Sequence, residues 1–97
     1  MANYWKCLKS QTEGPQEWAL WTTIANLATL NTSGQITDAP DLVRKGDVIY
    51  GRTGCTAVTS VATRAAFTAQ GIYMATADAS SGALDLSDGM AMETDSD

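Results

Sequence analysis

The stretch Arg44-Lys45-Gly46-Asp47-Val48-Ile49-Tyr50 decides the fold, because it joins a turn directly to an apolar strand. The preceding residues 38–43, Asp-Ala-Pro-Asp-Leu-Val, place an aspartate ahead of a proline, a pattern typical of the start of a short helix. Arg44 and Lys45 suit the C-terminal end of such a helix, and Gly46 ends it. Residues 47–50 then predict a buried strand that leaves the turn.

Upstream of this stretch, the sequence predicts strands joined by turns. Residues 3–9 are rich in Tyr and Trp and predict a strand or an extended arm, while a Gly-Pro pair marks a turn within residues 10–16. Residues 17–30 hold apolar side chains at helical spacing, but the β-branched Thr22 and Thr23 disfavour a helix. We therefore expect a strand, a loop and a second strand there.

Downstream, glycine turns separate further extended segments. Gly51 and Gly54 bound a second turn, residues 55–63 predict a Thr- and Val-containing strand, and residues 65–77 predict one or two more. Strands at this spacing indicate a mainly β fold, namely a small antiparallel β-barrel or sandwich with one short helical turn. The chain then divides into an N-terminal strand or arm with its turn (1–16), a β domain (17–77) and a flexible acidic tail (78–97).

The charge of the chain is concentrated at its C-terminal end. The 97 residues include 11 acids, 6 bases and no histidine, which gives a net charge of −5. Residues 1–77 hold five of the acids and all six bases, whereas residues 78–97 hold six acids and no base. There is neither a basic cluster nor a run of ~20 apolar residues, so we expect neither a nucleic-acid partner nor a membrane partner.

Catalytic chemistry has little support in this sequence. Without histidine there is no histidine base, no Ser–His or Cys–His pair and no histidine ligand for a metal. Asp38, Asp41 and Asp47 are better explained as cap and turn residues than as a catalytic pair. Cys7 and Cys55 are expected to be free thiols. We predict a protein that is not an enzyme, with no catalytic, metal-binding or cofactor-binding residues.

Aromatic side chains are the main candidates for a core or an interface. Leu, Ile, Val and Phe together account for only 16 of the 97 residues. This fraction is below the level of about 20% at which a chain begins to lack apolar side chains for a core. A chain of this kind is stabilised more easily when it shares a core with copies of itself or with a larger neighbour. Trp and Tyr are also common anchors of interfaces. The six candidates are Tyr4, Trp5, Trp18, Trp21, Tyr50 and Tyr73.

Residues 27–30 and 33–50 resemble a segment of small virion proteins of tailed bacteriophages. In that group a comparable run follows a tryptophan-containing strand and precedes a β region rich in Thr, Val and Ser. The resemblance extends from Trp18 to Val61, is most specific at residues 44–49, and is accompanied by an N-terminus, residues 1–7, of the kind found there. Its turn and strand signature consists of Asp38, Pro40, Lys45, Gly46, Asp47, Val48 and Ile49.

The resemblance implies a structural component of a phage particle, namely a capsid decoration or cement protein that stabilises the shell. Its partners would be the major capsid protein or another virion protein, and it would be assembled into the virion in the host cytoplasm. We expect a homo-oligomer, with a trimer favoured, in which aromatic residues are buried between copies. The alternatives are a component of the tail, neck or fibre, or a small cytosolic regulator with an acidic tail.

Overall fold

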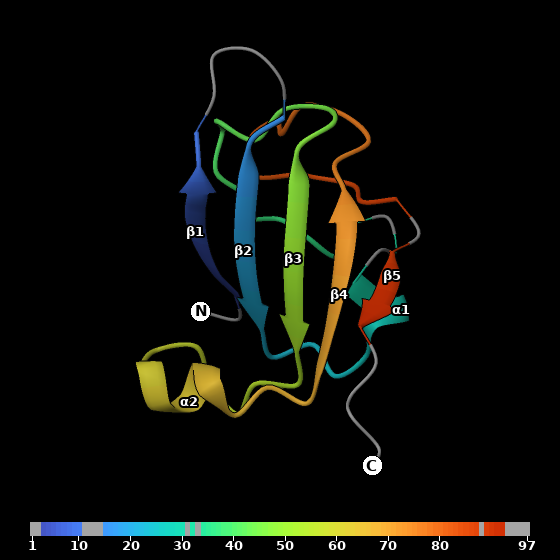
Figure 1. The fold of residues 1–97 in the computed structure, drawn as a ribbon. Coiled ribbons are helices and arrows are strands. Elements are labelled where there is room, and N and C mark those ends of the chain that lie inside the picture. The colour runs from blue at the N-terminus through green and yellow to red at the C-terminus, as the bar shows by residue number, and fades with distance from the viewer. Residues whose placement is uncertain (1–2, 11–14, 31, 33, 88, 93–97) are drawn as a thin grey trace.

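The computed structural model describes residues 3–10, 15–30, 32, 34–87 and 89–92. Its elements are β1 (Asn3–Lys9), β2 (Glu17–Thr22), α1 (Leu27–Leu30), β3 (Val48–Thr53), α2 (Val61–Ala65), β4 (Ala69–Met74) and β5 (Met90–Met92). The strands form one sheet of five in the order β1-β2-β3-β4-β5, with β1 and β5 at its edges (Figure 1). The prediction of a mainly β fold is therefore confirmed.

The sheet is mixed, so the prediction of a purely antiparallel arrangement is wrong. β2 and β3 run parallel, with Trp18 opposite Ile49, whereas the other three pairs are antiparallel. A parallel pair needs a connection long enough to return the chain to the starting edge. Residues 23–47 provide that connection, and its described part passes behind the sheet as it is seen in Figure 1.

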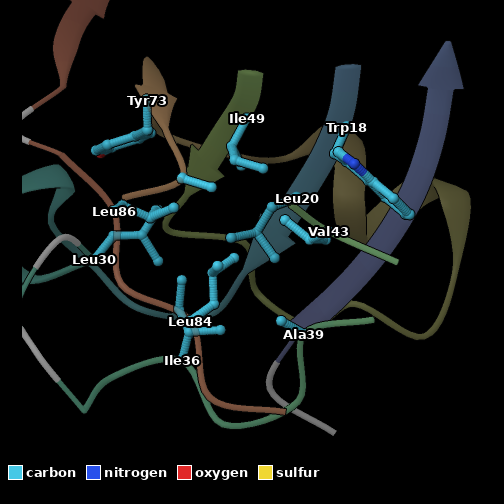
Figure 2. Packing of buried hydrophobic residues seen from close by; sticks show 11 residues of the cluster. Trp18, Leu20, Leu30, Ile36, Ala39, Val43, Ile49, Tyr73, Leu84 and Leu86 are labelled. Atoms are coloured by element: carbon cyan, nitrogen blue, oxygen red, sulfur yellow. The ribbon is translucent and has the colours of Figure 1, made fainter. Parts of the chain in front are cut away.

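The two faces of the sheet have different surroundings, because successive side chains of a strand point to opposite sides. On the covered face, strand residues such as Leu20 and Ile49 pack against the connecting segments (Figure 2). Those segments contribute Leu30, Ile36, Ala39, Val43, Ala75, Leu84 and Leu86 to the core. Among the described residues, the opposite face is covered only near α2, and we call it the open face.

Residues 78–87 belong to the core layer, so the prediction of a flexible acidic tail is wrong for this part of the chain. Leu84 is 4% exposed and Leu86 is 6% exposed, while Asp85 between them is exposed to solvent. Leu84 forms a β-bridge with Ile36, and Leu86 forms one with Ala75. Alternation of this kind buries both leucines and keeps the charge outside. Residue 88 and residues 93–97 lie outside the described residues.

The short helix expected over residues 38–43 is absent, and turns take its place. The carboxylate of Asp38 accepts hydrogen bonds from the side chains of Asn3 and Trp5, so it does not cap a helix. Val43 N donates to Pro40 O, which closes a turn that does not continue as a helix.

Two of the expected strands are helical or irregular instead. The second strand within residues 17–30 is replaced by α1, where the N–H groups of Thr29 and Leu30 both donate to Asn26 O. The strand expected at residues 55–63 is replaced by a loop and α2. Ser60 caps α2 by accepting a hydrogen bond from Thr63 N, and the Thr63 hydroxyl accepts one from Ser60 N. This reciprocal cap favours helix over strand for the residues that follow.

The N-terminal segment is a strand of the sheet and not an extended arm. β1 pairs with β2 from Asn3, opposite Thr22, to Lys9, opposite Glu17, with an irregularity between Cys7 and Lys9. The turn predicted within residues 10–16 includes residues 11–14, which lie outside the described residues.

Candidate functional site

Asp47 lies in the turn before β3, and its carboxylate joins two parts of the chain. The residue is only 2% exposed. Its Oδ1 accepts the backbone N–H of Gln16 at 3.0 Å. Its Oδ2 accepts from Gln16 Nε2 at 3.0 Å, from Trp18 Nε1 at 3.1 Å and from Arg44 N at 2.9 Å. Asp47 therefore holds the start of β2 against the turn at residues 43–47.

The charge of Asp47 is stabilised by these donors. Burial by itself would raise the pKa of this carboxyl, but the hydrogen bonds from Arg44, Gln16 and Trp18 outweigh it and lower the pKa below its usual 3.8. A carboxylate that is kept ionised and accepts four hydrogen bonds from the protein is a poor base. The geometry gives Asp47 the turn role that its position in the sequence predicts.

The neighbouring signature residues also form structural hydrogen bonds, through their backbone N–H groups. Gly46 adopts a φ of +92°, in the left-handed region that favours glycine, and its N–H donates to Ala75 O at 2.8 Å. Lys45 N donates to Asp78 Oδ1 at 2.9 Å. These bonds attach the turn to the segment that follows β4. The signature is therefore a structural junction, within which Ile49 is fully buried and Val48 is half-buried.

The two cysteines are free thiols in different settings. Cys7 is exposed on β1, and Cys55 is buried two residues after the end of β3. Burial raises the pKa of the Cys55 thiol despite nearby Arg52 and Arg64. A buried thiol with a raised pKa is a weak nucleophile.

The six candidate aromatic residues divide equally between the two faces of the sheet. Trp18 and Tyr73 belong to the core on the covered face, and Trp5 packs against that core while partly buried. Tyr4, Trp21 and Tyr50 occupy the open face, where Tyr4 is 37% exposed and the other two are half-buried. Burial in the core leaves little surface for an interface role only at Trp18 and Tyr73, which are 4% and 3% exposed.

One part of the open face is apolar. Val48 lies opposite Met74 and Tyr50 lies opposite Ile72 on the paired strands β3 and β4, and we call these four residues the apolar patch. Met74 is 47% exposed and the other three are half-buried. The Tyr50 hydroxyl donates to Glu17 Oε1 at 2.9 Å, and this bond, with a smaller contribution from burial, raises the pKa of Tyr50.

The other part of the open face combines aromatic rings with cations. Tyr4, Trp21 and Arg52 are successive partners across β1, β2 and β3, and we call them, together with Arg64 of α2, the cationic row. Arg52 Cζ lies 5.2 Å from the centre of the Trp21 ring, and Arg64 Cζ lies 4.0 Å from that of Tyr4. The Tyr4 and Trp21 rings are themselves 5.6 Å apart. Guanidinium groups stacked in this way keep their in-plane N–H donors for other partners.

A surface hollow of about 260 Å³ lies over the cationic row. Lys6, Arg52 and Arg64 line it together with Tyr4 and Trp21, and no acidic residue is among its lining residues. The hydrogen bonds of the two guanidinium groups go to uncharged acceptors, from Arg52 Nε to Gln70 and from Arg64 Nη1 to Val58 O. The hollow is thus a concentration of positive charge on a chain whose net charge is negative.

Sequence reasoning missed the arginines of this row. Arg52 and Arg64 are distant in sequence from Tyr4, and they join it only because β2 and β3 pair in parallel and α2 folds back over the sheet end. The alternation of Tyr4 and Lys6 along β1 was the available signal for a shared face.

Comparisons with protein-family models, with curated proteins and with solved structures found no match to this chain. Neither helix within the described residues has the length and apolar character needed to cross a bilayer.

Proposed function

We propose that this protein is a non-enzymatic structural protein that acts by assembling with copies of itself through the open face of its sheet. The observation that carries the proposal is the apolar patch, in which four large side chains remain solvent-accessible on the central strands β3 and β4. Large apolar residues gathered on one face of a small protein are typical of an interaction site.

The occupant of the apolar patch is a second copy of the chain, with a trimer as the favoured assembly. Packing of open faces from different copies would supply the second layer of a sandwich or the closure of a barrel, neither of which the described residues of one copy form. The small number of large aliphatic residues supports this proposal, because copies that share a core compensate for a deficit in each one.

The resemblance of residues 18–61 to phage virion proteins suggests the larger assembly. In this proposal the oligomer binds the major capsid protein on the capsid surface as a decoration or cement protein and stabilises the shell. The saturated carboxylate of Asp47 and the buried thiol of Cys55 support a role without catalysis. The proposal includes no cofactor, no nucleic acid and no membrane.

The assembly is tested by measuring the mass of the protein in solution with and without Met74→Lys. The introduced charge has access to water in the monomer, because Met74 is 47% exposed, but it would be buried in the proposed interface. We expect a trimer for the parent chain and a monomer for Met74→Lys. Val61→Lys is the matched control, since Val61 is 74% exposed on α2 and lies outside the apolar patch. A parent that stays monomeric at all concentrations contradicts the proposal.

The virion role is tested separately by locating the protein in purified particles. Density on the capsid surface would support decoration, whereas density in the tail, neck or fibre would support the alternative structural role. Absence from particles, together with a salt-sensitive complex with a basic host protein, would support a cytosolic regulator instead.

A further inference from the structure

We propose that the hollow over the cationic row is a binding site for an extended acidic peptide, and that its occupant is the C-terminal segment of the same chain, residues 93–97. This inference concerns the opposite end of the open face from the apolar patch and goes beyond the proposed function. It rests on charge complementarity and on the point at which the described chain ends.

The charges of the two partners are opposite and match in number. The hollow is lined by three cations, Lys6, Arg52 and Arg64, without a carboxylate among its lining residues. Residues 93–97 are Glu-Thr-Asp-Ser-Asp, which contains three acids and no base. The acids alternate with Thr and Ser, so that in an extended segment all three carboxylates lie on one side.

The described chain ends in register with the cationic row. Met92 of β5 is opposite Gln70 of β4, and Gln70 is opposite Arg52 of β3, which is followed across the sheet by Trp21. Neighbouring strands are about 4.8 Å apart, which places Arg52 about 10 Å and Trp21 about 14 Å from Met92 across the sheet. Five extended residues span up to about 17 Å. Residues 93–97 are therefore long enough to reach Arg52 and Trp21, and Arg64 Cζ lies 6.0 Å from the centre of the Trp21 ring.

The direction of β5 also favours this occupant. β5 passes from Met90, opposite Ile72, to Met92, opposite Gln70, and so points toward the end of the sheet where α2 lies (Figure 1). That is the end at which Arg64 stacks on Tyr4. A segment tethered this close has an effective concentration in the millimolar range, which gives it an advantage over the same segment of another copy.

Each ion pair in such a site is weak, so binding depends on several ion pairs that form together. Single exposed ion pairs contribute little, but a guanidinium held on an aromatic ring presents two donors to a carboxylate in a fixed geometry. Arg52 and Arg64 are both held in this way, by Trp21 and Tyr4. The interaction depends on charge, so salt at about 1 M, where the screening length is about 3 Å, should abolish it.

The test compares the full chain with the triple variant Glu93→Gln, Asp95→Asn, Asp97→Asn by NMR of the Trp21 indole and the Arg52 and Arg64 guanidinium groups. We expect these signals to differ between the two proteins at low salt and to coincide at about 1 M salt. The control Asp85→Asn removes an exposed acid elsewhere and should leave the three signals unchanged. Coincident signals at low salt would overturn the proposal.

A free peptide, Glu-Thr-Asp-Ser-Asp, then identifies the ligand and its source. Added to the triple variant, it should restore the signals of the parent. The uncharged peptide Gln-Thr-Asn-Ser-Asn should not restore them. The acidic peptide should also fail when the triple variant carries the additional substitution Arg64→Gln. The parent chain should need at least tenfold more peptide, because its own segment competes. If the NMR signals of the parent and of the triple variant respond equally to added peptide, the segment of the same chain is not the occupant. The same holds if the parent signals change on dilution, because dilution weakens binding between copies. Neither result depends on whether the protein forms trimers or occurs in particles.

Discussion

At the scale of single residues, the buried carboxylate of Asp47 links the start of β2 to the turn before β3 through four hydrogen bonds. Asp47→Asn keeps the size of the side chain but replaces one acceptor oxygen with an NH₂ group that faces N–H donors from Gln16, Trp18 and Arg44. We expect a loss of about 3 kcal/mol in the free energy of unfolding, because buried donors lose a charged acceptor. Urea unfolding measures it, and exposed Asp41→Asn should change it by less than about 0.5 kcal/mol. Equal effects of the two substitutions would contradict the role of Asp47.

The same carboxylate predicts how stability depends on pH. The pKa of Asp47 is lower in the folded protein than its usual 3.8, so the unfolded chain binds the proton more readily. Its contribution to stability is complete above the unfolded pKa of about 3.9 and is lost as the pH falls through the lower folded pKa. Urea midpoints measured from about pH 5 to pH 2 should fall less steeply for Asp47→Asn than for the parent. Parallel curves would mean that Asp47 titrates alike in both states.

The turn role of Asp47 could be predicted from the sequence, but its partners could not. The order of Gly46, Asp47 and Val48 indicates a turn that enters a strand, and the structure has both. The donors Gln16 and Trp18 lie 31 and 29 residues away, and they meet Asp47 only because β2 and β3 pair in parallel. Local patterns contain no information about such a pairing.

At the scale of elements, two glycines on β3 and β4 make room for a core aromatic residue. Gly51 lies opposite Gly71, and a Cβ at Gly51 would lie 2.9 Å from both Leu30 Cδ2 and Tyr73 Cε1. We expect Gly51→Ala to lower the free energy of unfolding by about 2 kcal/mol, because both neighbours are buried and cannot move freely. Gly71→Ala, whose closest contacts are 3.2–3.3 Å, should cost less in the same thermal or urea measurement. The reverse order would contradict this packing.

Elements were predictable where apolar alternation and turn residues agree. Residues 3–9, 17–22, 48–50 and 69–74 fall in segments expected to be extended, and all four lie in strands. The helix expected at residues 38–43 fails because distant side chains use Asp38 as an acceptor. The strand expected at residues 55–63 fails because the cap formed by Ser60 and Thr63 outweighs the β propensity of the Thr and Val residues around it.

At the scale of the whole molecule, the core explains how a chain with few aliphatic residues and an acidic C-terminal part can fold. The low number of aliphatic residues suggested a deficit, and the acidic end suggested a tail without structure. Leu84 and Leu86 belong to that acidic part, yet both are core residues. The covered face thus uses apolar residues from nearly the whole described chain, and the apolar patch is left over on the other side. Net charge over a long window could not reveal two buried leucines that flank an exposed aspartate.

We therefore expect the substitution of isoleucine by alanine to have different effects on the two faces of the sheet. Ile49 is fully buried on the covered face, and Ile49→Ala should lower the free energy of unfolding by about 3 kcal/mol. Ile72 lies half-buried in the apolar patch, so Ile72→Ala should cost the single copy less than about 1 kcal/mol. In sedimentation velocity over a concentration series, Ile72→Ala should instead shift the equilibrium toward monomers, because it removes apolar area from the proposed interface. Equal losses of monomer stability, or an unchanged distribution of masses for Ile72→Ala, would contradict the division of the sheet into a core face and an assembly face.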